Sequence, residues 1–332
     1  MLTAEEQRLV AKVARLYYEQ ELSQSQIAAQ LDLSQATVSR LLKRAIEARI
    51  VQILVTLPAG FNAEMEEALQ RKYGLKEAIV VDVSADDDDD RIQRTLGTAA
   101  AFYLQTTLKQ NEIIGLSSWS ATLLAIVDSM KALSRPIEAQ VVQILGGMGN
   151  PSAEAHANRL TDRLARLVHG HGVYLPAPGI VSSEQTRREF LADHFVREAT
   201  VLFDQVTLAL VGIGDLQPSK LLASSGNRFT SDELAQLRGK GAVGDICLRF
   251  FDADGAPVDS ALDGRVISIT LEQLKAVRRS VGVAGGVRKL AAIRAALRGR
   301  WINVLITDRY VAEGLLAGDE LPEQTFSVES SD

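Results

Sequence analysis

The chain contains a single cysteine, Cys247, among its 332 residues, so no internal disulfide bond can form. A reducing compartment is therefore expected. No apolar run approaches the ~18 residues that a membrane-spanning helix needs, and the first ten residues lack the apolar core of a signal peptide. These absences predict a cytoplasmic protein that does not associate with a membrane.

The chain also lacks an excess of positive charge, because 42 acidic residues outnumber 36 basic ones and give a net charge of -6. This balance argues against non-specific coating of nucleic acid, although affinity for DNA depends on local charge. Hydrophobic residues make up 46% of the chain and charged residues 23%, which is typical of a folded globular protein. A chain of this length can contain a small domain and one or two further hydrophobic cores.

Patterns that bind metals or dinucleotides are scarce as well. His169 and His171 are the closest histidine pair, and this spacing is weak evidence for a metal site. The acidic run at 86–90 is interpreted as a solvated loop, with a hard-cation site as the weaker alternative, because adjacent carboxylates on a flexible loop do not form a cage. The glycine-rich segments at 146–149 and 212–214 do not complete a dinucleotide fingerprint. We therefore predict no metal and no cofactor.

Residues 23–44 have the spacing of a helix pair that reads DNA. Ser23 and Ser34 are placed to cap two successive helices. Apolar residues recur at helical spacing in both of them: Ile27, Ala28 and Leu31, then Val38, Leu41 and Leu42. The other face of the second helix carries short polar and then basic side chains, as a recognition helix does. We predict that these residues contact operator DNA: Gln35, Thr37, Ser39, Arg40, Lys43 and Arg44.

An ordinary helical hairpin with a solvated face is the alternative, since helix-turn-helix shapes also occur in proteins that never bind DNA. Asp32 stands in the turn where glycine is common, but aspartate tolerates a left-handed backbone better than most residues. Residues 35–50 contain four basic residues against Glu47, a net charge of +3. This weak local charge indicates that two or more copies must bind DNA together.

The chain is expected to have four parts. Residues 1–57 form the DNA-binding domain, residues 58–75 a linker with a helix that ends at Gly74, and residues 321–332 a C-terminal tail. In residues 76–320 short strands alternate with helices, which predicts an α/β fold with a mostly parallel sheet covered on both faces. The clearest strands are 78–83, 112–116, 139–145, 206–211, 281–283 and 303–307, and the clearest helices are 92–109, 121–133, 158–167 and 289–297.

Polar segments follow several of these strands, where the ligands of parallel sheets bind. The segment 117–122 follows a strand and opens a helix, so its hydroxyls and free amides suit a phosphate. A helix cap with spare hydroxyls explains it equally well. Asp245 and Lys289 would offer a carboxylate and an ammonium to a sugar. On the residues alone, a surface salt bridge is the slightly better explanation for this pair.

Six longer motifs occur in order: SQSQIAAQLDLSQATVSRLLKRA, GLSSWSATL, GGMGN, LPAPGIV, GAVGDICLRFFDADG and VAGGVRKLAAIRAALRGRWINVLITD. Together they cover the chain almost from end to end and resemble the SorC family of bacterial sugar-responsive transcription regulators. The resemblance implies a helix-turn-helix domain followed by an effector domain with the fold of sugar-phosphate isomerases, glucosamine-phosphate deaminases and CoA transferases. It also implies phosphorylated sugars or polyols as effectors, and homo-oligomers, dimers or tetramers, on operator DNA.

The resemblance also implies an effector site. Its phosphate-binding loop falls on Ser117, Ser118, Ser120, Ala121 and Thr122, its hydroxyl-binding acid on Asp245 and its effector-binding lysine on Lys289. The same pocket would be lined by Gly146, Gly147, Gly149 and Asn158. This chain departs from the family at Ser120, where many members have glycine, and at Val287 and Arg288, which replace smaller or acidic residues.

The favoured hypothesis is a transcription regulator of a carbohydrate-utilisation operon whose DNA affinity is changed by a phosphorylated sugar or polyol. The alternative is a sugar-phosphate isomerase or deaminase with an accessory DNA-binding domain, in which Asp245 and Lys289 act as acid and base. An isomerase has no need of the N-terminal domain, and no further carboxylate and histidine complete a catalytic set. We therefore expect no catalytic residues and no enzymatic activity.

Overall fold

The computed structural model describes residues 3–52, 62–117, 119–148, 151–217 and 230–317, without the side chains of 151–153 and 156. The chain divides into two compact units, Met1–Ala59 and Gly60–Asp332. Each unit is described by itself below. In the described ranges, no helix is both long enough and apolar enough to cross a bilayer.

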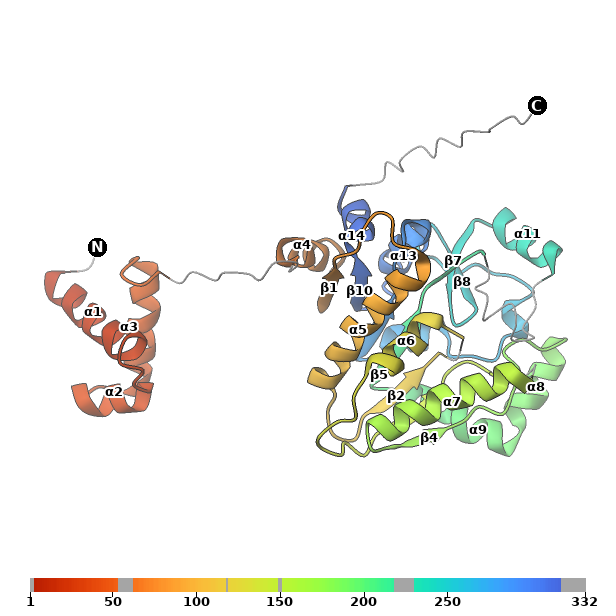
Figure 1. The fold of residues 1–332 in the computed structure, drawn as a ribbon, viewed down its shortest axis with the longest axis horizontal. Helices are drawn as coiled ribbons and strands as arrows, with labels where there is room; N and C mark the ends of the chain where they lie inside the picture. The colour runs from red at the N-terminus through yellow and green to blue at the C-terminus, as the bar shows by residue number, and fades with distance from the viewer. Residues whose placement is uncertain (1–2, 53–61, 118, 149–150, 218–229, 318–332) are drawn as a thin grey trace, which may run out of the picture. The chain divides into compact units, whose positions relative to one another are not determined.

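The N-terminal unit contains the predicted helix pair. Its helices are α1 (Ala4–Tyr18), α2 (Gln24–Leu31) and α3 (Gln35–Glu47), drawn in red to orange in Figure 1. Ser23 and Ser34 cap α2 and α3 by accepting hydrogen bonds from backbone amides three residues on. Asp32 ends α2 in the left-handed conformation, with φ +56°. The apolar faces of the three helices enclose a small core that includes Val13, Ile27, Ala28, Val38 and Leu42.

The C-terminal unit is built on a parallel sheet, as the sequence predicts (Figure 1). The described strands run in the order β1-β10-β9-β5-β2-β3-β4, and every neighbouring pair is parallel. They are β1 (Glu77–Val81), β2 (Ile113–Leu116), β3 (Gln140–Gln143), β4 (His171–Val173), β5 (Leu208–Gly212), β9 (Arg279–Val283) and β10 (Val304–Asp308). Six of the strands coincide with the predicted segments, and β4 is the additional one.

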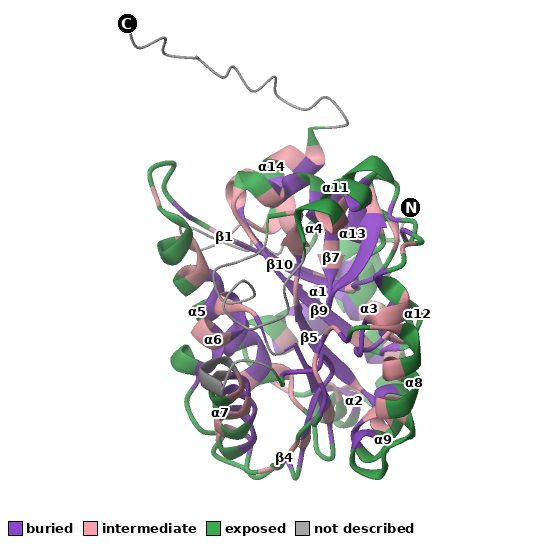
Figure 2. Ribbon diagram, turned by 90° about the vertical axis from the view of Figure 1, so that its right-hand side faces the viewer, coloured by how far each residue is buried: buried purple, intermediate pink, exposed green. Residues whose placement is uncertain are grey.

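Helices cover both faces of the sheet, and Figure 2 shows the buried strands between them. One face packs against α5 (Asp89–Thr107), α6 (Ala121–Ser129) and α7 (Pro151–Leu167). The other packs against helices that include α4 (Ala63–Tyr73), α9 (His194–Thr200), α12 (Leu271–Ala276), α13 (Leu290–Arg298) and α14 (Arg309–Leu316). Two further helices, α8 (Glu184–Ala192) and α11 (Ser231–Gly239), lie at the periphery. The parallel α/β architecture expected from the strand-helix alternation is confirmed.

A second, antiparallel sheet was not anticipated from the sequence. It consists of β6 (Gly214–Asp215), β7 (Ala242–Ile246) and β8 (Arg249–Asp252). The β7–β8 turn has Cys247 and Leu248 at its centre, with φ of +52° and +63°. Two-residue hairpins with positive φ at both central positions usually contain glycine or asparagine. The turn is therefore a site of backbone strain, held by the packing around it.

Helix α4 belongs to the C-terminal unit, which corrects its expected role as part of a separate linker. Strand β1 is at the edge of the sheet, and Val80 points its backbone N–H and C=O outward. Glu66 Oε1 accepts from that N–H at 2.9 Å, and Asn62 Nδ2 donates to that C=O at 3.0 Å. At the other end of α4, Lys72 and Tyr73 donate to the carbonyl of Leu315. The expected boundary at 57 and the tail at 321–332 lie outside the described residues.

Candidate functional site

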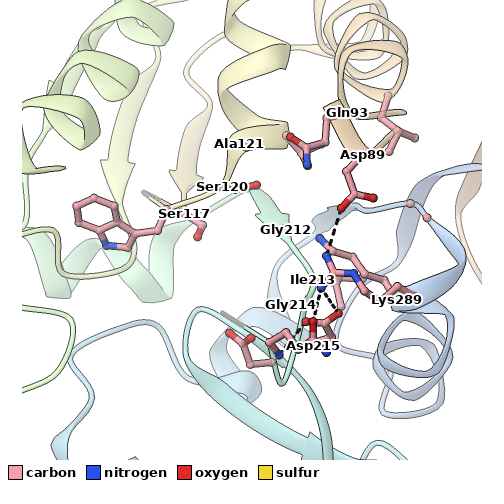
Figure 3. Close-up of a pocket in the computed structure, with 18 of the residues that line it drawn as sticks. Asp89, Gln93, Ser117, Ser120, Ala121, Gly212, Ile213, Gly214, Asp215 and Lys289 are labelled. Carbon is pink, nitrogen blue, oxygen red and sulfur yellow. Dashed lines mark hydrogen bonds and ion pairs between the residues drawn. The ribbon is translucent and has the colours of Figure 1, made fainter. Parts of the chain in front are cut away.

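A pocket opens at the carboxyl ends of β2, β5 and β9, within the C-terminal unit. Its cavity volume is about 120 Å³. Six segments that are distant in sequence form its walls: α5, the β2–α6 loop, Leu145 after β3, β5 with β6, the β7–β8 hairpin and the turn after β9. Figure 3 shows Ser117, Ser120 and Ala121 on one side of this space and Asp215 and Lys289 on the other.

The start of α6 forms one wall. Ser120 caps this helix, since its Oγ accepts from the backbone N–H of Leu123 at 3.3 Å. Ala121 and Thr122 occupy the first turn, which has no acidic residue. A Cβ on Gly212 would come within 2.9 Å of Ser120 Oγ, so the end of β5 closely approaches the helix start. Free amides, hydroxyls and a positive helix end face the pocket together, an arrangement that suits an anion.

Asp245 is the acidic group of the opposite wall. Burial raises the pKa of its carboxyl to about 6, while the hydrogen bond from the Leu248 N–H and the charge of Lys289 act in the other direction. That N–H meets Asp245 Oδ2 at 3.0 Å, which ties the carboxylate to the strained hairpin turn. The Oδ1 atom occupies the space that a Cβ on Gly214 would take. Gly214 therefore makes room for the carboxylate in the pocket.

Lys289 is the basic group beside it, at the end of a short 3-10 turn that follows Gly286. Burial lowers the pKa of its ammonium, and Asp215 is the strongest of the charges that oppose the shift. A carboxylate and an ammonium that share one half-buried space offer both an acceptor for hydroxyls and a cation for an anionic or carbonyl oxygen. The thiol of Cys247 also lines the pocket, but burial raises its pKa to about 12 and keeps it protonated.

Arg288 connects two walls of the pocket. Its Nη1 lies 2.9 Å from Asp215 Oδ2, and its Nη2 lies 3.5 Å from Asp89 Oδ2 at the start of α5. Gln93, one turn further along α5, lines the same wall. Sequence reasoning missed Asp89, because the acidic run was interpreted as a loop, although Asp88 caps α5 and Asp89 is its first residue.

The structure brings together part of the expected effector set: Ser117, Ser120, Ala121, Thr122, Asp245 and Lys289 all line this pocket. Ser118 and Gly149 lie outside the described residues. Gly146 and Gly147 do not line it, which corrects their expected position. Trp119 lines the pocket and donates from Nε1 to the carbonyl of Gly146 at 3.1 Å. The bulky indole thus contacts the glycine loop and forms the pocket wall itself.

Asn158 is the other residue that the structure places elsewhere. Its Oδ1 accepts from Gln143 Nε2 at 3.0 Å, and the same nitrogen of the buried Gln143 side chain also donates to Thr161 Oγ1 at 3.2 Å. Asn158 lines a separate surface depression with Asp162 and Tyr174. Its contacts therefore hold α7 on β3, and the expectation that it lines the effector pocket is wrong for this structure.

The predicted DNA-contacting side chains share the outer face of α3. Gln35, Ser39, Arg40, Lys43 and Arg44 are exposed. Thr37 is half-buried, and its hydroxyl is within 2.8 Å of that of Ser34. Arg40 folds back toward the helix start, donating to Thr37 Oγ1 at 3.3 Å, while Arg44 pairs with Glu6 of α1 at 3.6 Å.

Comparison with known proteins covers both units. Residues 58–317 match the family described as "Putative sugar-binding domain", and residues 2–48 match "Sigma-70, region 4". The deoxyribonucleoside regulator of Bacillus subtilis (strain 168) is 36% identical, over 94% of this chain and 98% of the relative. The sorbitol operon regulator of Klebsiella pneumoniae is 32% identical, over 95% of this chain and all of the relative.

The solved structures agree with these sequence matches. The crystal structure of the full-length sorbitol operon regulator SorC from Klebsiella pneumoniae has a TM-score of 0.71 and 31% identity, and the match covers 95% of this chain and 100% of that one. The match thus includes the N-terminal helices as well as the α/β unit. The chain therefore belongs to the SorC family of transcriptional regulators, in which a helix-turn-helix region precedes a sugar-binding domain.

Proposed function

We propose that this regulator controls a carbohydrate-utilisation operon and that a phosphorylated sugar or polyol, bound in the pocket, changes its affinity for operator DNA. The main support is the pocket itself, which joins a helix start that would suit an anion to the Asp245 and Lys289 pair. Two relatives are named for sorbitol and for deoxyribonucleosides, and both kinds of compound carry several hydroxyl groups. Hydroxyls suit the acidic side of the pocket, and a phosphate suits the start of α6.

Control of DNA binding requires that the effector prefers one of two arrangements of the oligomer, because a ligand shifts an equilibrium only by its differential affinity. The pocket offers a physical basis for such a preference. One wall carries Ser120 and Asp89, and the other carries Asp215 and Asp245. An effector that contacts both walls would stabilise the arrangement in which they are closest.

We further propose that the domain senses its ligand and does not transform it. Asp245 and Lys289 would suffice to bind and orient an effector. The alternative, an isomerase or deaminase, needs a further group to move protons. Among the residues that the structure describes, no histidine lines the pocket, and the thiol of Cys247 is held protonated. Both observations favour a binding site.

The effector is expected to bind through its phosphate. In calorimetry, sorbitol 6-phosphate or another sugar phosphate should bind at least ~10-fold more tightly than the matching free sugar, because a hydrogen bond to a charged group contributes about 1.5–3 kcal/mol. Ser120→Ala should reduce that advantage. Ser183→Ala is the matched control, since it removes a serine cap of the same kind from α8, which lies outside the pocket. Equal affinities of the ester and the free sugar would identify a neutral polyol instead.

Arg40→Ala and Lys43→Ala are expected to affect DNA binding in different ways. If Arg40 reads a guanine, its loss costs ~1–3 kcal/mol at one position of a palindromic operator. Lys43, one turn further along α3, is assigned to a phosphate contact. Its loss should therefore weaken binding to all duplexes alike and reduce the slope of log affinity against log salt concentration. Fluorescence anisotropy over a salt series on duplexes from the protein's own gene cluster measures both effects.

Arg71→Ala provides the control for these variants, because it removes an exposed cation from α4 in the C-terminal unit. Its affinity and salt slope should equal those of the wild type. Wild-type values in both α3 variants would show that a different face of the N-terminal unit meets DNA.

A further inference from the structure

Arg288 lies at the exposed rim of the effector pocket, in the 3-10 turn Val287–Lys289. Its side chain is 47% exposed, whereas the backbone of the turn is fixed. The N–H of Gly286 donates to Asp308 Oδ2 at 2.6 Å, and the N–H of Lys289 donates to the carbonyl of Gly286 at 2.9 Å. The guanidinium can therefore exchange its partners without a change in the fold around it.

The two ion pairs of Arg288 differ in strength. Its Nη1 lies 2.9 Å from Oδ2 of Asp215, whose side chain is only 13% exposed. Its Nη2 lies 3.5 Å from Oδ2 of Asp89, whose side chain is 65% exposed. This second pair contributes little, because both side chains remain in contact with water. One half of the guanidinium is thus held on β6, while the other half is only loosely occupied by a carboxylate of α5 (Figure 3 labels both acids).

Arg288 also has hydrogen-bonding capacity to spare. A guanidinium carries five N–H donors in a planar fork. Its Nη1 donates one long hydrogen bond to Gln217 Oε1, at 3.5 Å, and its other nitrogens donate none to the residues that the structure describes. An acceptor group of the effector would therefore find free donors on this side chain.

The charges of the pocket limit which acceptor group suits Arg288. Three carboxylates line the pocket against two cations, Arg288 and Lys289: they are those of Asp89, Asp215 and Asp245. A second phosphate would bring up to two further negative charges into a space that already has an excess of acid. A single carboxylate would replace that of Asp89 charge for charge, and its two oxygens match the guanidinium fork. A neutral hydroxyl would leave this side of the cation without a charged partner.

We propose that the effector is a phosphorylated sugar acid and that Arg288 selects it, by exchanging the carboxylate of Asp89 for that of the ligand. The inference rests on the proposed function, because it takes the phosphate to lie at the start of α6. The carboxylate, at the other end of the ligand, then lies at the wall formed by β6 and the turn after β9. The sugar hydroxyls between the two ends remain available to Asp245.

Calorimetry of the full chain with two esters tests this selection. 6-Phosphogluconate and sorbitol 6-phosphate differ only at the end away from the phosphate, which carries a carboxylate in the first and an alcohol in the second. The wild type should bind 6-phosphogluconate about 5- to 10-fold more tightly, because a charged hydrogen bond is gained and a weak surface ion pair is lost. Arg288→Gln should reverse this preference, because the ligand carboxylate would then face the acids of the pocket without the cation. Its affinity for sorbitol 6-phosphate should remain close to that of the wild type.

Two further variants show whether the charge or the shape of this side chain matters. Arg288→Lys keeps the charge without the planar fork, so it should keep a reduced preference for the acid. Arg309→Gln is the matched control, since Arg309 is 37% exposed, lies 3.7 Å from Asp82 Oδ1 and does not line the pocket. It should keep the wild-type preference, and circular dichroism should show that all three variants are folded.

Asp89→Asn gives a second readout, of opposite sign. It removes the carboxylate that competes for Arg288, so the affinity for 6-phosphogluconate should rise about 2- to 5-fold. The affinity for sorbitol 6-phosphate should change little. Asp90→Asn is its control, because it removes the same charge from the first turn of α5 and does not line the pocket. If the Arg288–Asp89 pair only held the two walls together, Arg288→Gln and Asp89→Asn would weaken both esters alike, and that result would overturn the inference.

The remaining outcomes separate this inference from the proposed function. Equal affinities of the wild type for the two esters, tighter binding of a sugar phosphate without a carboxylate, or a preference for the acid that survives Arg288→Gln would each overturn the inference. Each of these would leave the proposed function intact. If no sugar phosphate binds to the wild type, the proposed function fails and the inference fails with it.

Discussion

Lys289→Ala and Asp245→Ala should each abolish the effect of the effector on operator binding, while the protein stays folded and binds operator without effector. Each substitution removes a charged hydrogen-bonding group from the pocket, which corresponds to ~1.5–3 kcal/mol or about a 10- to 100-fold loss of effector affinity. The effect of Lys289→Ala should be the larger, because it also leaves the carboxyl of Asp245 without its neighbouring cation, while Asp215 keeps its ion pair with Arg288. Anisotropy of labelled operator during an effector titration gives the response directly.

Lys131→Ala is the control for this experiment, since it removes an exposed lysine that does not line the pocket. Thermal shift supplies a parallel readout: a ligand at 100 times its dissociation constant adds ~2.7 kcal/mol to wild-type stability, and the two pocket variants should lose this gain. Interconversion or deamination of a sugar phosphate by the purified protein, removed by the same substitutions, would instead support the isomerase or deaminase alternative.

The isosteric variant Asp245→Asn separates stability from binding. Because burial raises the pKa of Asp245 to about 6, the folded state favours the protonated carboxyl. The protonated Asp245 carboxyl contributes fully to the free energy of unfolding below pH ~4, and this contribution is lost as the pH rises through 6. Asp245→Asn should therefore raise the unfolding free energy at pH 7.5 by ~1–3 kcal/mol and flatten its pH dependence. The variant would be more stable than the wild type and yet insensitive to effector.

Gly214→Ala should reduce effector affinity about as much as Asp245→Ala does, although it adds only a methyl group. The added Cβ would overlap Asp245 Oδ1, so the carboxylate must turn away or β6 must shift. Displacements of this kind cost ~1–3 kcal/mol. Operator affinity without effector should change little, because the N-terminal unit is untouched. Calorimetry with the best sugar phosphate measures the loss.

Gly239→Ala is the matched control for this glycine. No atom lies within 4 Å of a Cβ at Gly239, which ends α11. Alanine is also the better helix former, so this variant should be neutral or slightly stabilising. Normal effector affinity in Gly214→Ala would mean that Asp245 does not contact the ligand in this pocket.

Local signals explain which parts of the fold are predictable from the sequence. Ser23 and Ser34 mark helix starts because a capping hydroxyl acts on amides only three residues away. The buried strands stand out as short apolar runs. Strand β4 gives no such signal, since its three residues include Gly172 and are exposed or half-buried. Strand β6 is only two residues long and exists through its pairing with β7.

The sequence predicts the pocket only in part, again where the signal is local. Ser120 and Lys289 follow parallel strands, and the carboxyl ends of such strands meet at one edge of the sheet. The wall on α5 comes from tertiary packing, so no local pattern links Asp89 to Arg288. Gly146 also follows a strand, but the indole of Trp119 forms the wall beside it. Position after a strand therefore indicates the correct edge, while side-chain volume decides which residues reach the cavity.

Helix α4 has a consequence for any excised effector domain. A fragment that begins at Lys76, where the alternating strands and helices begin, would lack Asn62 and Glu66. The N–H and C=O of Val80 would then face solvent along β1. An unpaired strand edge is a template for a strand from another molecule, and it promotes aggregation. A soluble fragment must therefore begin before Asn62, so that the first helix of the C-terminal unit also acts as the shield that keeps effector domains from joining edge to edge.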